Sequence, residues 1–480
     1  MDIRSVTHIL GSLLIFMALT LLLPVPFALY YHDGMVPVFA WSSAITLAGG
    51  LLMFLLFRAH KELHLREGFA VVTFSWLLFA LFGALPYVVS GAVPSMLDAV
   101  FETMSGFTTT GATILTSIEE MPQSLLFWRA LTHWLGGMGI IVLSLAILPM
   151  LGVGGMQLFR AEVPGPTADR LKPRIQDTAK LLWGVYVILT AAETVLLMGG
   201  GMSFYEAVCH AFATMATGGF STRDASIAAY DSAYIDTVIT FFMFMAGVNF
   251  SLHYYALRGR IGTYFRNEEF RFYLLVTLGV TATLMWLNHG SVYDSVLENL
   301  RYSAFQTAAI LTTTGFATAD YELWAVLAQY LLVFMMFIGG CAGSTGGGMK
   351  VARILLLLKH GLAQLFRLIH PRTVRLVKLG NKAVDPDVMQ AILGFFALFM
   401  GVFVSASFLL AACGMDMVSA GAAVIATLGN IGPGIGSIGP TDNYAHVPDF
   451  GKGVLILCML LGRLELFTVL VLFLPSFWRK

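Results

Sequence analysis

The stretch that decides the fold is Ser-Gly-Phe-Thr-Thr-Thr-Gly-Ala-Thr, at residues 105–113. Three further stretches combine Thr or Asn with Gly in a similar way: Met-Ala-Thr-Gly-Gly-Phe-Ser-Thr at 215–222, Leu-Thr-Thr-Thr-Gly-Phe-Ala-Thr at 311–318 and Thr-Leu-Gly-Asn-Ile-Gly-Pro-Gly at 427–434. Their aligned glycines, Gly111, Gly219, Gly315 and Gly432, are 108, 96 and 117 residues apart. A motif that returns at a nearly constant interval predicts a fold made of repeated units.

A short apolar run precedes each of these stretches. The four runs lie near residues 94–106, 203–216, 293–311 and 416–428. A helix needs about 20 apolar residues to cross a bilayer, so none of these runs is long enough to cross. Non-helical backbone is tolerated at membrane depth only where it is buried or lines an aqueous path. We therefore expect four half-helices that enter the membrane and return through a loop.

Longer apolar runs surround these half-helices. They lie near residues 7–30, 36–57, 69–90, 125–151, 181–200, 233–257, 272–288, 325–340 with 351–369, 388–413, and 453–477. Hydrophobic residues make up 58% of the 480 and charged residues 12%, with no net charge, and the mean hydropathy is +0.79. This composition excludes a soluble enzyme, a disordered chain and a nucleic-acid binder, and predicts an all-α polytopic membrane protein. The four cysteines are scattered and suggest neither a disulfide framework nor a metal site.

The runs divide the chain into a two-helix unit and four repeats of helix, half-helix, loop and helix. We place the two-helix unit at 1–67 and the repeats at 68–179, 180–270, 271–383 and 384–480. Asp98 and Glu102 lie 13 and 9 residues before Gly111, and Glu206 and His210 keep these offsets before Gly219. The third and fourth half-helices do not keep this pair of offsets.

Charge predicts the orientation. All but five of the 28 basic residues fall at Arg4 or in the segments 58–66, 160–180, 258–271, 350–382 and 479–480, which share one side if the N-terminus is cytoplasmic. The exceptions are Arg129, Arg223, Arg301, Lys452 and Arg463. The positive-inside rule therefore favours cytoplasmic termini. Most acids fall on the outer side, including Asp98, Glu102, Asp224 and Glu322; they either concentrate cations there or are indifferent to sidedness.

The loops have the composition of an ion filter. Gly brings its carbonyl oxygen close to a ligand, Thr adds hydroxyl oxygens, and four loops around one axis can replace the water shell of a cation. The candidate ion-binding residues are Thr109, Thr110, Gly111, Thr217, Gly218, Gly219, Thr313, Thr314, Gly315, Asn430, Ile431 and Gly432. The alternative is that these small residues are helix-packing surfaces; four copies at the ends of short apolar runs favour the filter.

These four loops, the helix plan and the Gly-rich run at 339–348 resemble the Trk/Ktr/HKT superfamily of potassium transporters. The extra N-terminal helix pair is similar to that of its bacterial TrkH/TrkG branch. The resemblance implies four fused pore-like repeats around a pseudo-fourfold axis, in a multi-pass protein of the bacterial inner membrane. It also implies a homodimer with a cytosolic ring of TrkA-like nucleotide-binding subunits.

The resemblance also implies what the loops bind. In this superfamily, Gly at the key position of all four loops goes with potassium, whereas Ser in the first loop goes with sodium. K⁺ would therefore be both bound and transported, without a covalent cofactor. Because the loops depart from the Thr-Val-Gly-Tyr-Gly of true channels, we expect one short ring of carbonyl sites rather than a long filter.

A Gly-rich run, Gly-Gly-Cys-Ala-Gly-Ser-Thr-Gly-Gly-Gly at 339–348, interrupts the third returning helix. Glycine is costly in a helix, so we expect an intramembrane loop, spanning about 339–350. A phosphate cradle would need a preceding strand and a closing Gly-Lys-Ser/Thr, which the run lacks. The resemblance implies a gate beneath the filter, and the alternative is a passive kink. The candidate gate residues are Gly343, Ser344, Thr345, Gly346, Gly347 and Arg463.

Arg463 lies about ten residues into the last apolar run. A charge at this depth costs ~2.5 kcal/mol or more, so it should face the pore or a partner. The resemblance implies that it projects into the path, whereas pairing with the buried acid Glu193 is the alternative. Glu465 points roughly 200° away from Arg463 on a helix and is no obvious helix-face partner. We interpret Glu193 as a packing residue, and His133, His210 and His253 as structural.

Three functions remain open. The first is a potassium-uptake pore; the second is a proton- or sodium-coupled symporter with broken helices; the third is a membrane enzyme, against which the lack of a catalytic constellation argues. The basic stretch 359–382 suits either anionic membrane lipid or a cytosolic regulator.

Overall fold

The computed structural model describes residues 2–57, 65–139, 175–373, 376–380 and 382–479. Six helices in this part are long and apolar enough to span a membrane if α1 with α2 and α4 with α5 each count as one. They are α1 (Ile3–Thr20) with α2 (Val25–Tyr31), α3 (Val36–Leu56), α4 (Leu65–Gly83) with α5 (Leu85–Ser90), α10 (Ile175–Gly199), α15 (Glu268–Asn288) and α19 (Pro386–Ala412). The prediction of a polytopic helical membrane protein is confirmed.

Four shorter helices lie where the half-helices are expected. They are α6 (Met96–Phe107), α11 (Phe204–Met215), α16 (Val296–Leu311) and α20 (Met417–Leu428). Each begins with a side-chain cap, from Ser95, Ser203, Ser295 or Asp416, that accepts a backbone N–H of the first turn. Such caps satisfy donors that have no partner inside the helix, and they fix where it starts.

Other helices are broken. Two bent pairs are α12 (Ala233–Ala246) with α13 (Phe250–Leu257), and α21 (Asp449–Arg463) with α22 (Phe467–Leu470) and the 3-10 turn η5 (Val471–Phe473). Their bends are 106° and 113°. The apolar runs predicted at 233–257 and 453–477 are therefore bent pairs of helices rather than straight ones. Asn249 caps a new helix in the first case, and the left-handed residues Glu465 and Leu466 end the helix in the second.

The break in the third returning helix falls where the Gly-rich run predicts it, between α17 (Val326–Met335) and α18 (Val351–Ile369). In the first repeat, α7 (Gln123–Trp134) continues into the π-helical turn η1 (Leu135–Gly139). The remaining elements are η3 (Ser226–Tyr230), α14 (Gly262–Arg266), η4 (Tyr321–Leu323), strands β1 (Lys378–Leu379) and β2 (Lys382–Ala383), and α23 (Pro475–Trp478).

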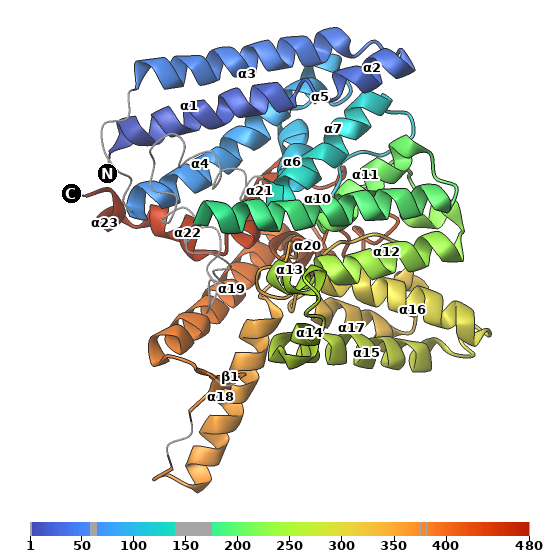
Figure 1. The fold of residues 1–480 in the computed structure, drawn as a ribbon, viewed down its shortest axis with the longest axis vertical. Helices are drawn as coiled ribbons and strands as arrows, with labels where there is room; N and C mark the ends of the chain where they lie inside the picture. The colour runs from blue at the N-terminus through green and yellow to red at the C-terminus, as the bar shows by residue number, and fades with distance from the viewer. Residues whose placement is uncertain (1, 58–64, 140–174, 374–375, 381, 480) are drawn as a thin grey trace.

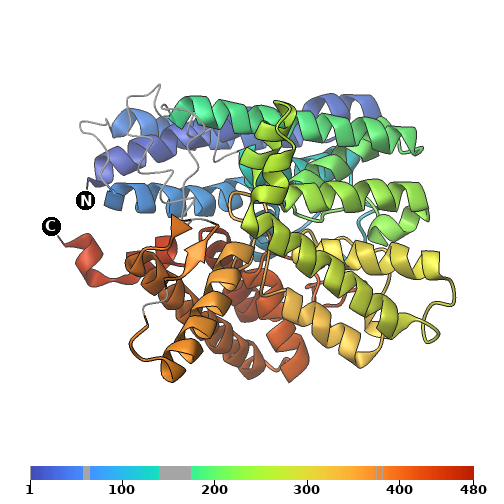
Figure 2. The ribbon, with the colours of Figure 1, turned by 60° about the horizontal axis from the view of Figure 1, so that its bottom comes forward.

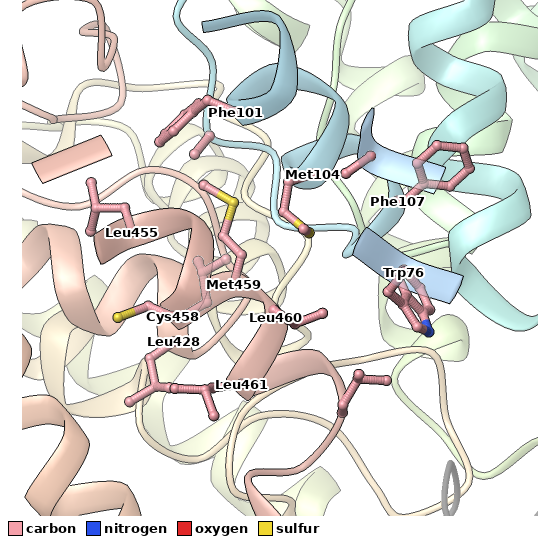
Figure 3. Packing of buried hydrophobic residues seen from close by; sticks show 14 of the residues in the cluster. Trp76, Phe101, Met104, Phe107, Leu428, Leu455, Cys458, Met459, Leu460 and Leu461 are labelled. Carbon is pink, nitrogen blue, oxygen red and sulfur yellow. The ribbon is translucent and has the colours of Figure 1, made fainter. Parts of the chain in front are cut away.

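The N-terminal pair, α1 and α3, lies along one edge of the molecule (Figure 1). Gly11 and Gly50 allow this approach, because a Cβ on Gly11 would lie 2.8 Å from the Gly50 carbonyl oxygen. Both chain ends lie on one side (Figures 1 and 2), and α18 extends away from the helical body (Figure 1). Figure 3 shows how Phe101 and Met104 of α6 and Met459 of α21 lie in one hydrophobic cluster, which joins the start and the end of the chain.

Some expectations lie outside the described residues. These are the part of the 125–151 run beyond 139 and the basic residues Arg58, Lys61, Arg160, Arg170, Lys172, Arg174, Arg375 and Lys480. The boundaries between the repeats stay predictions.

Candidate functional site

The four Gly-rich loops share one backbone conformation. In each, a residue with positive φ is followed by one without it and then by a glycine with positive φ. The first positions are Thr109 (51°), Thr217 (55°), Thr313 (62°) and Asn430 (55°); the glycines are Gly111 (81°), Gly219 (79°), Gly315 (78°) and Gly432 (98°). Alternation of this kind turns successive peptide groups so that like atoms face one side of the loop. Non-Gly residues rarely adopt positive φ, so four equivalent cases indicate a common constraint.

Each filter glycine contacts the next loop. A Cβ on Gly111 would lie 2.2 Å from the Gly218 oxygen, and one on Gly219 would lie 2.0 Å from the Thr314 oxygen. Likewise, a Cβ on Gly315 would lie 1.9 Å from the Ile431 oxygen, and one on Gly432 would lie 2.6 Å from the Thr110 oxygen. The loops therefore contact one another in a closed cycle, from the first to the fourth and back. No side chain fits at these glycines without moving the neighbouring carbonyl group.

Side chains also meet within the cycle. The amide nitrogen of Asn430 donates to Thr110 Oγ1 at 2.9 Å and to the Met459 carbonyl at 3.0 Å, so it joins the fourth loop to the first. The Thr109 hydroxyl and the Asn430 amide oxygen are buried without a hydrogen-bond partner in the described part of the chain. Unpaired buried oxygens are costly, and a dehydrated cation would satisfy them.

The five exceptional basic residues have structural partners near the loops. The ion pairs of four are Arg129–Glu102 (2.6 Å), Arg223–Glu206 (2.7 Å), Arg301–Asp236 (2.7 Å) and Lys452–Asp98 (2.6 Å). Of the two interpretations of the acids, Glu102 favours the one without a cation-concentrating mouth, because its side chain is 0% exposed and forms a pair with Arg129. Acids of the outer side are thus partly neutralised, which weakens the idea of an acidic funnel.

The carboxyl groups of Glu206 and Glu322 have pKa values shifted in opposite directions. Burial would raise the pKa of Glu206, but hydrogen bonds led by that from Arg223 outweigh it and lower this pKa below its ordinary value. For Glu322, burial and the charge of Asp320 raise the pKa, although its carboxylate accepts the Gly436 N–H. The interaction with Gly436 joins η4 to the fourth loop.

The Gly-rich segment 339–350, which we call the intramembrane loop, lies against the C-terminal ends of the half-helices. Thr345 Oγ1 donates to the Met215 carbonyl at 3.0 Å and to the Ala246 carbonyl at 3.2 Å. Gly347 N donates to Thr313 Oγ1 at 2.6 Å, so the loop bonds directly to a candidate filter residue. A Cβ on Gly347 would lie 2.4 Å from the Gly429 carbonyl oxygen. The loop therefore contacts the second, third and fourth repeats beneath the cycle.

Arg463 ties this loop to the first repeat. One guanidinium nitrogen donates to the Thr345 carbonyl at 2.8 Å. Another donates to the carbonyls of Gly136 and Gly137, at 2.6 and 3.0 Å. Within the part of the chain that the structure describes, Glu193 forms no ion pair, so it is not the partner of Arg463 there. The planar fork of an Arg suits a tie to carbonyls on two separate segments.

A second charged group beside the loop was missed by sequence reasoning. Arg353, at the start of α18, forms an ion pair with Glu465, and its guanidinium lies 4.3 Å from the ring centroid of Phe395. Lys350 Nζ donates to the Gly346 carbonyl. The only signal in the sequence was that Glu465 is an unexplained acid in an apolar run.

Comparison with known proteins now identifies the family. The family model TrkH, described as a cation transport protein, matches residues 36–480. This chain belongs to the TrkH family. It is 46% identical over 486 residues to the Trk system potassium uptake protein TrkH of Escherichia coli K12, and 35% identical over 485 residues to TrkG of the same strain. The TrkH alignment covers 100% of both chains, and the TrkG alignment covers 100% of this chain and 99% of TrkG.

A solved structure shows the same fold. The crystal structure of the potassium transporter TrkH from Vibrio parahaemolyticus matches with a TM-score of 0.90 and 41% sequence identity, and it covers 100% of both chains. Family membership confirms the resemblance stated from the sequence, and this chain is a cation transport protein rather than an enzyme.

The three histidines have partners of different kinds. His133 Nδ1 donates to the Gly106 carbonyl at 2.8 Å, and its ring lies under Gly218. His253 contacts the hydroxyl of Tyr264 at 2.6 Å, away from the loops. His210 contacts Ser221 of the second loop. His210 thus has a role next to the candidate filter that ligand spacing could not reveal.

Proposed function

We propose that this chain is the pore of a potassium-uptake system, in which the four loops form one ring of K⁺-binding carbonyl groups. The observation that carries the proposal is the closed cycle of contacts through Gly111, Gly219, Gly315 and Gly432. The relatives' printed names, Trk system potassium uptake protein, support potassium as the ion. The candidate ion-binding residues are the twelve loop residues given above, and the unpaired Thr109 and Asn430 oxygens fit an ion nearby.

The intramembrane loop and Arg463 would close the path beneath this ring. The loop donates hydrogen bonds to Met215 and Ala246 through Thr345, and to Thr313 through Gly347. An ion that leaves the ring on this side would then have to displace the loop. Arg463 adds a fixed positive charge beside the same segment. Gating would therefore require the hydrogen bonds of the loop to break together.

The proposal extends to the partners of the chain and to its orientation in the membrane. The printed name "Trk system" implies further subunits, and we propose a TrkA-like nucleotide-binding ring on the cytosolic side, with the chain as a homodimer in the inner membrane. Cytoplasmic N- and C-termini fit the charge distribution. The exposed basic residues of α18 and the β1–β2 hairpin would face the regulator or anionic lipid.

Flux in proteoliposomes tests the pore directly. With K⁺ on both sides and a membrane potential imposed, we expect K⁺ to follow the electrical gradient without a gradient of any second ion. Strict dependence on protons or Na⁺ would instead support the coupled symporter. Glu193 is the residue to test in that case, because it is a fully buried carboxyl within the membrane-spanning helix α10. If the chain is a pore, Glu193→Gln should leave K⁺ flux unchanged. If it is a proton-coupled symporter, the same substitution should abolish the coupling.

A further inference from the structure

One position on each half-helix reaches its own loop. It lies nine residues before the filter glycine, and we call it the brace position. Its occupants are Glu102, His210, Gln306 and Ala423. The third half-helix does not keep the pair of offsets found in the first two, but at this one offset Gln306 is polar and buried like Glu102 and His210.

The first brace is charged. Glu102 accepts the Ile114 N–H at 2.9 Å and the Thr113 hydroxyl at 3.0 Å, so it holds the outer limb of the first loop. Arg129 Nε donates to Glu102 at 2.6 Å, and another nitrogen donates to the Ser221 carbonyl at 2.9 Å. The guanidinium also lies 3.5 Å from the ring centroid of Phe220. This buried pair therefore joins the first loop to the second.

The second and third brace positions hold His210 and Gln306, which form hydrogen bonds but no ion pair in the described part of the chain. His210 Nδ1 donates to the Glu206 carbonyl at 2.8 Å, which leaves Nε2 to accept from Ser221 Oγ at 3.0 Å. The amide of Gln306 lies against the third loop, and with its oxygen turned toward that loop it accepts the Thr318 N–H at 2.9 Å. Both groups contact the loop two or three residues beyond the filter glycine, as Glu102 does.

The fourth position holds Ala423, which has no side chain to reach its loop. Tyrosine hydroxyls from other segments bind this loop instead. Tyr444 donates to the Gly432 carbonyl and Tyr321 donates to the Gly434 carbonyl, both at 2.7 Å. The four loops are thus held unequally, by a charge pair, by two neutral groups and by external hydroxyls. Hydrogen bonds to charged groups are the strongest of these.

We propose that the brace residues, and Glu102 with Arg129 above all, are positioning residues that set the diameter of the carbonyl ring and so the preference for K⁺ over Na⁺. The inference rests on the proposed function. In the cavity-size account of selectivity, a carbonyl ring favours K⁺ because its loops resist collapse around the smaller Na⁺. Loosening a brace should therefore admit Na⁺ and change the permeability ratio more than the total flux.

The experiment compares K⁺/Na⁺ permeability ratios in proteoliposomes. We expect Glu102→Gln and Arg129→Lys to lower the ratio about three- to tenfold, and Gln306→Met to lower it less, because a charged hydrogen bond contributes more than a neutral one. Thr103→Val is the matched control, since this buried neighbour donates only within its own helix, to Ala99. Ala423→Gly is a second control that destabilises a half-helix without removing a brace.

The outcomes separate two claims. If Gly111→Ser lowers the ratio while Glu102→Gln, Arg129→Lys and Gln306→Met all match the parent, the brace inference is overturned and the filter stands. If Gly111→Ser also leaves the ratio unchanged, the filter assignment itself fails. Should the charge variants not fold, Gln306→Met and His210→Asn decide the matter, because both leave the buried ion pair intact. A ratio that falls equally in the Thr103→Val control would also contradict the inference, since it would reflect general loosening.

Discussion

At the scale of single residues, the filter glycines do two things at once. Gly219 takes a φ of 79° and leaves no room for a Cβ, which would lie 2.0 Å from the Thr314 oxygen. Sequence showed the first requirement through the repeated Thr and Gly, because glycine alone adopts such angles at little cost. It could not show the second, since which loop faces which glycine depends on the packing of segments about one hundred residues apart.

The first prediction concerns Gly111. In Gly111→Ser the new Cβ meets the Gly218 carbonyl, so this carbonyl must turn or retreat and the ring should admit Na⁺ more readily. We expect the K⁺/Na⁺ permeability ratio to fall about tenfold. Gly91→Ser is the control, because Gly91 has the same sign of φ (75°) but open space around it. An unchanged ratio for Ser at Gly111, Gly219, Gly315 and Gly432 alike would contradict the filter.

The second prediction concerns Arg463. Its charge would oppose an ion about 6 Å away by ~3 kcal/mol at an effective dielectric of 20, before screening by water. We expect Arg463→Ala to raise K⁺ flux severalfold to about tenfold. The K⁺ flux of Arg463→Lys should lie between those of the parent and the Ala variant, because Lys keeps the charge but cannot span both Thr345 and Gly136. An Ala variant that loses thermal stability while conducting at the parent rate would show a structural role instead.

At the scale of elements, the sequence predicted the lengths of the half-helices well, but it predicted the positions of helix kinks less well. The half-helices followed from short apolar runs that end in glycine, and all four lie within a few residues of expectation. The kinks after Ala246 and Arg463 were not predicted, because no proline lies at either kink, since Pro475 stands at the far end of the second run, and glycine is common in membrane helices. What stabilises them is tertiary: Gly247 accepts Cys341 N–H, and Glu465 forms an ion pair with Arg353.

The third prediction belongs to the intramembrane loop. Deleting residues 343–347 should raise basal K⁺ flux, because the proposed function places this segment across the path, and it should weaken control by a cytosolic partner. Thr345→Val is the milder test, since it removes only the hydroxyl that donates to Met215 and Ala246. We expect a smaller rise in the same assay. A deletion variant that folds and conducts like the parent would reduce the loop to a passive kink.

At the scale of the whole molecule, hydropathy and charge were sufficient for fold class, while orientation stays a prediction. Both termini lie on one side (Figure 1). The fourth prediction follows from the positive-inside rule: a cysteine at Lys378 should react with an impermeant maleimide only after the cells are opened, and one at Asp294 should react in intact cells. Both positions are exposed. Cys413→Ser removes the partly exposed native thiol from the background.

The central claim is that the four loops hold a dehydrated K⁺ in one ring. The most direct measurement is anomalous scattering from crystals grown with Rb⁺ in place of K⁺. We predict an anomalous peak on the axis of the cycle, enclosed by the carbonyls of Thr110, Gly218, Thr314 and Ile431. A well-ordered map of these loops with rubidium bound only elsewhere would contradict the account.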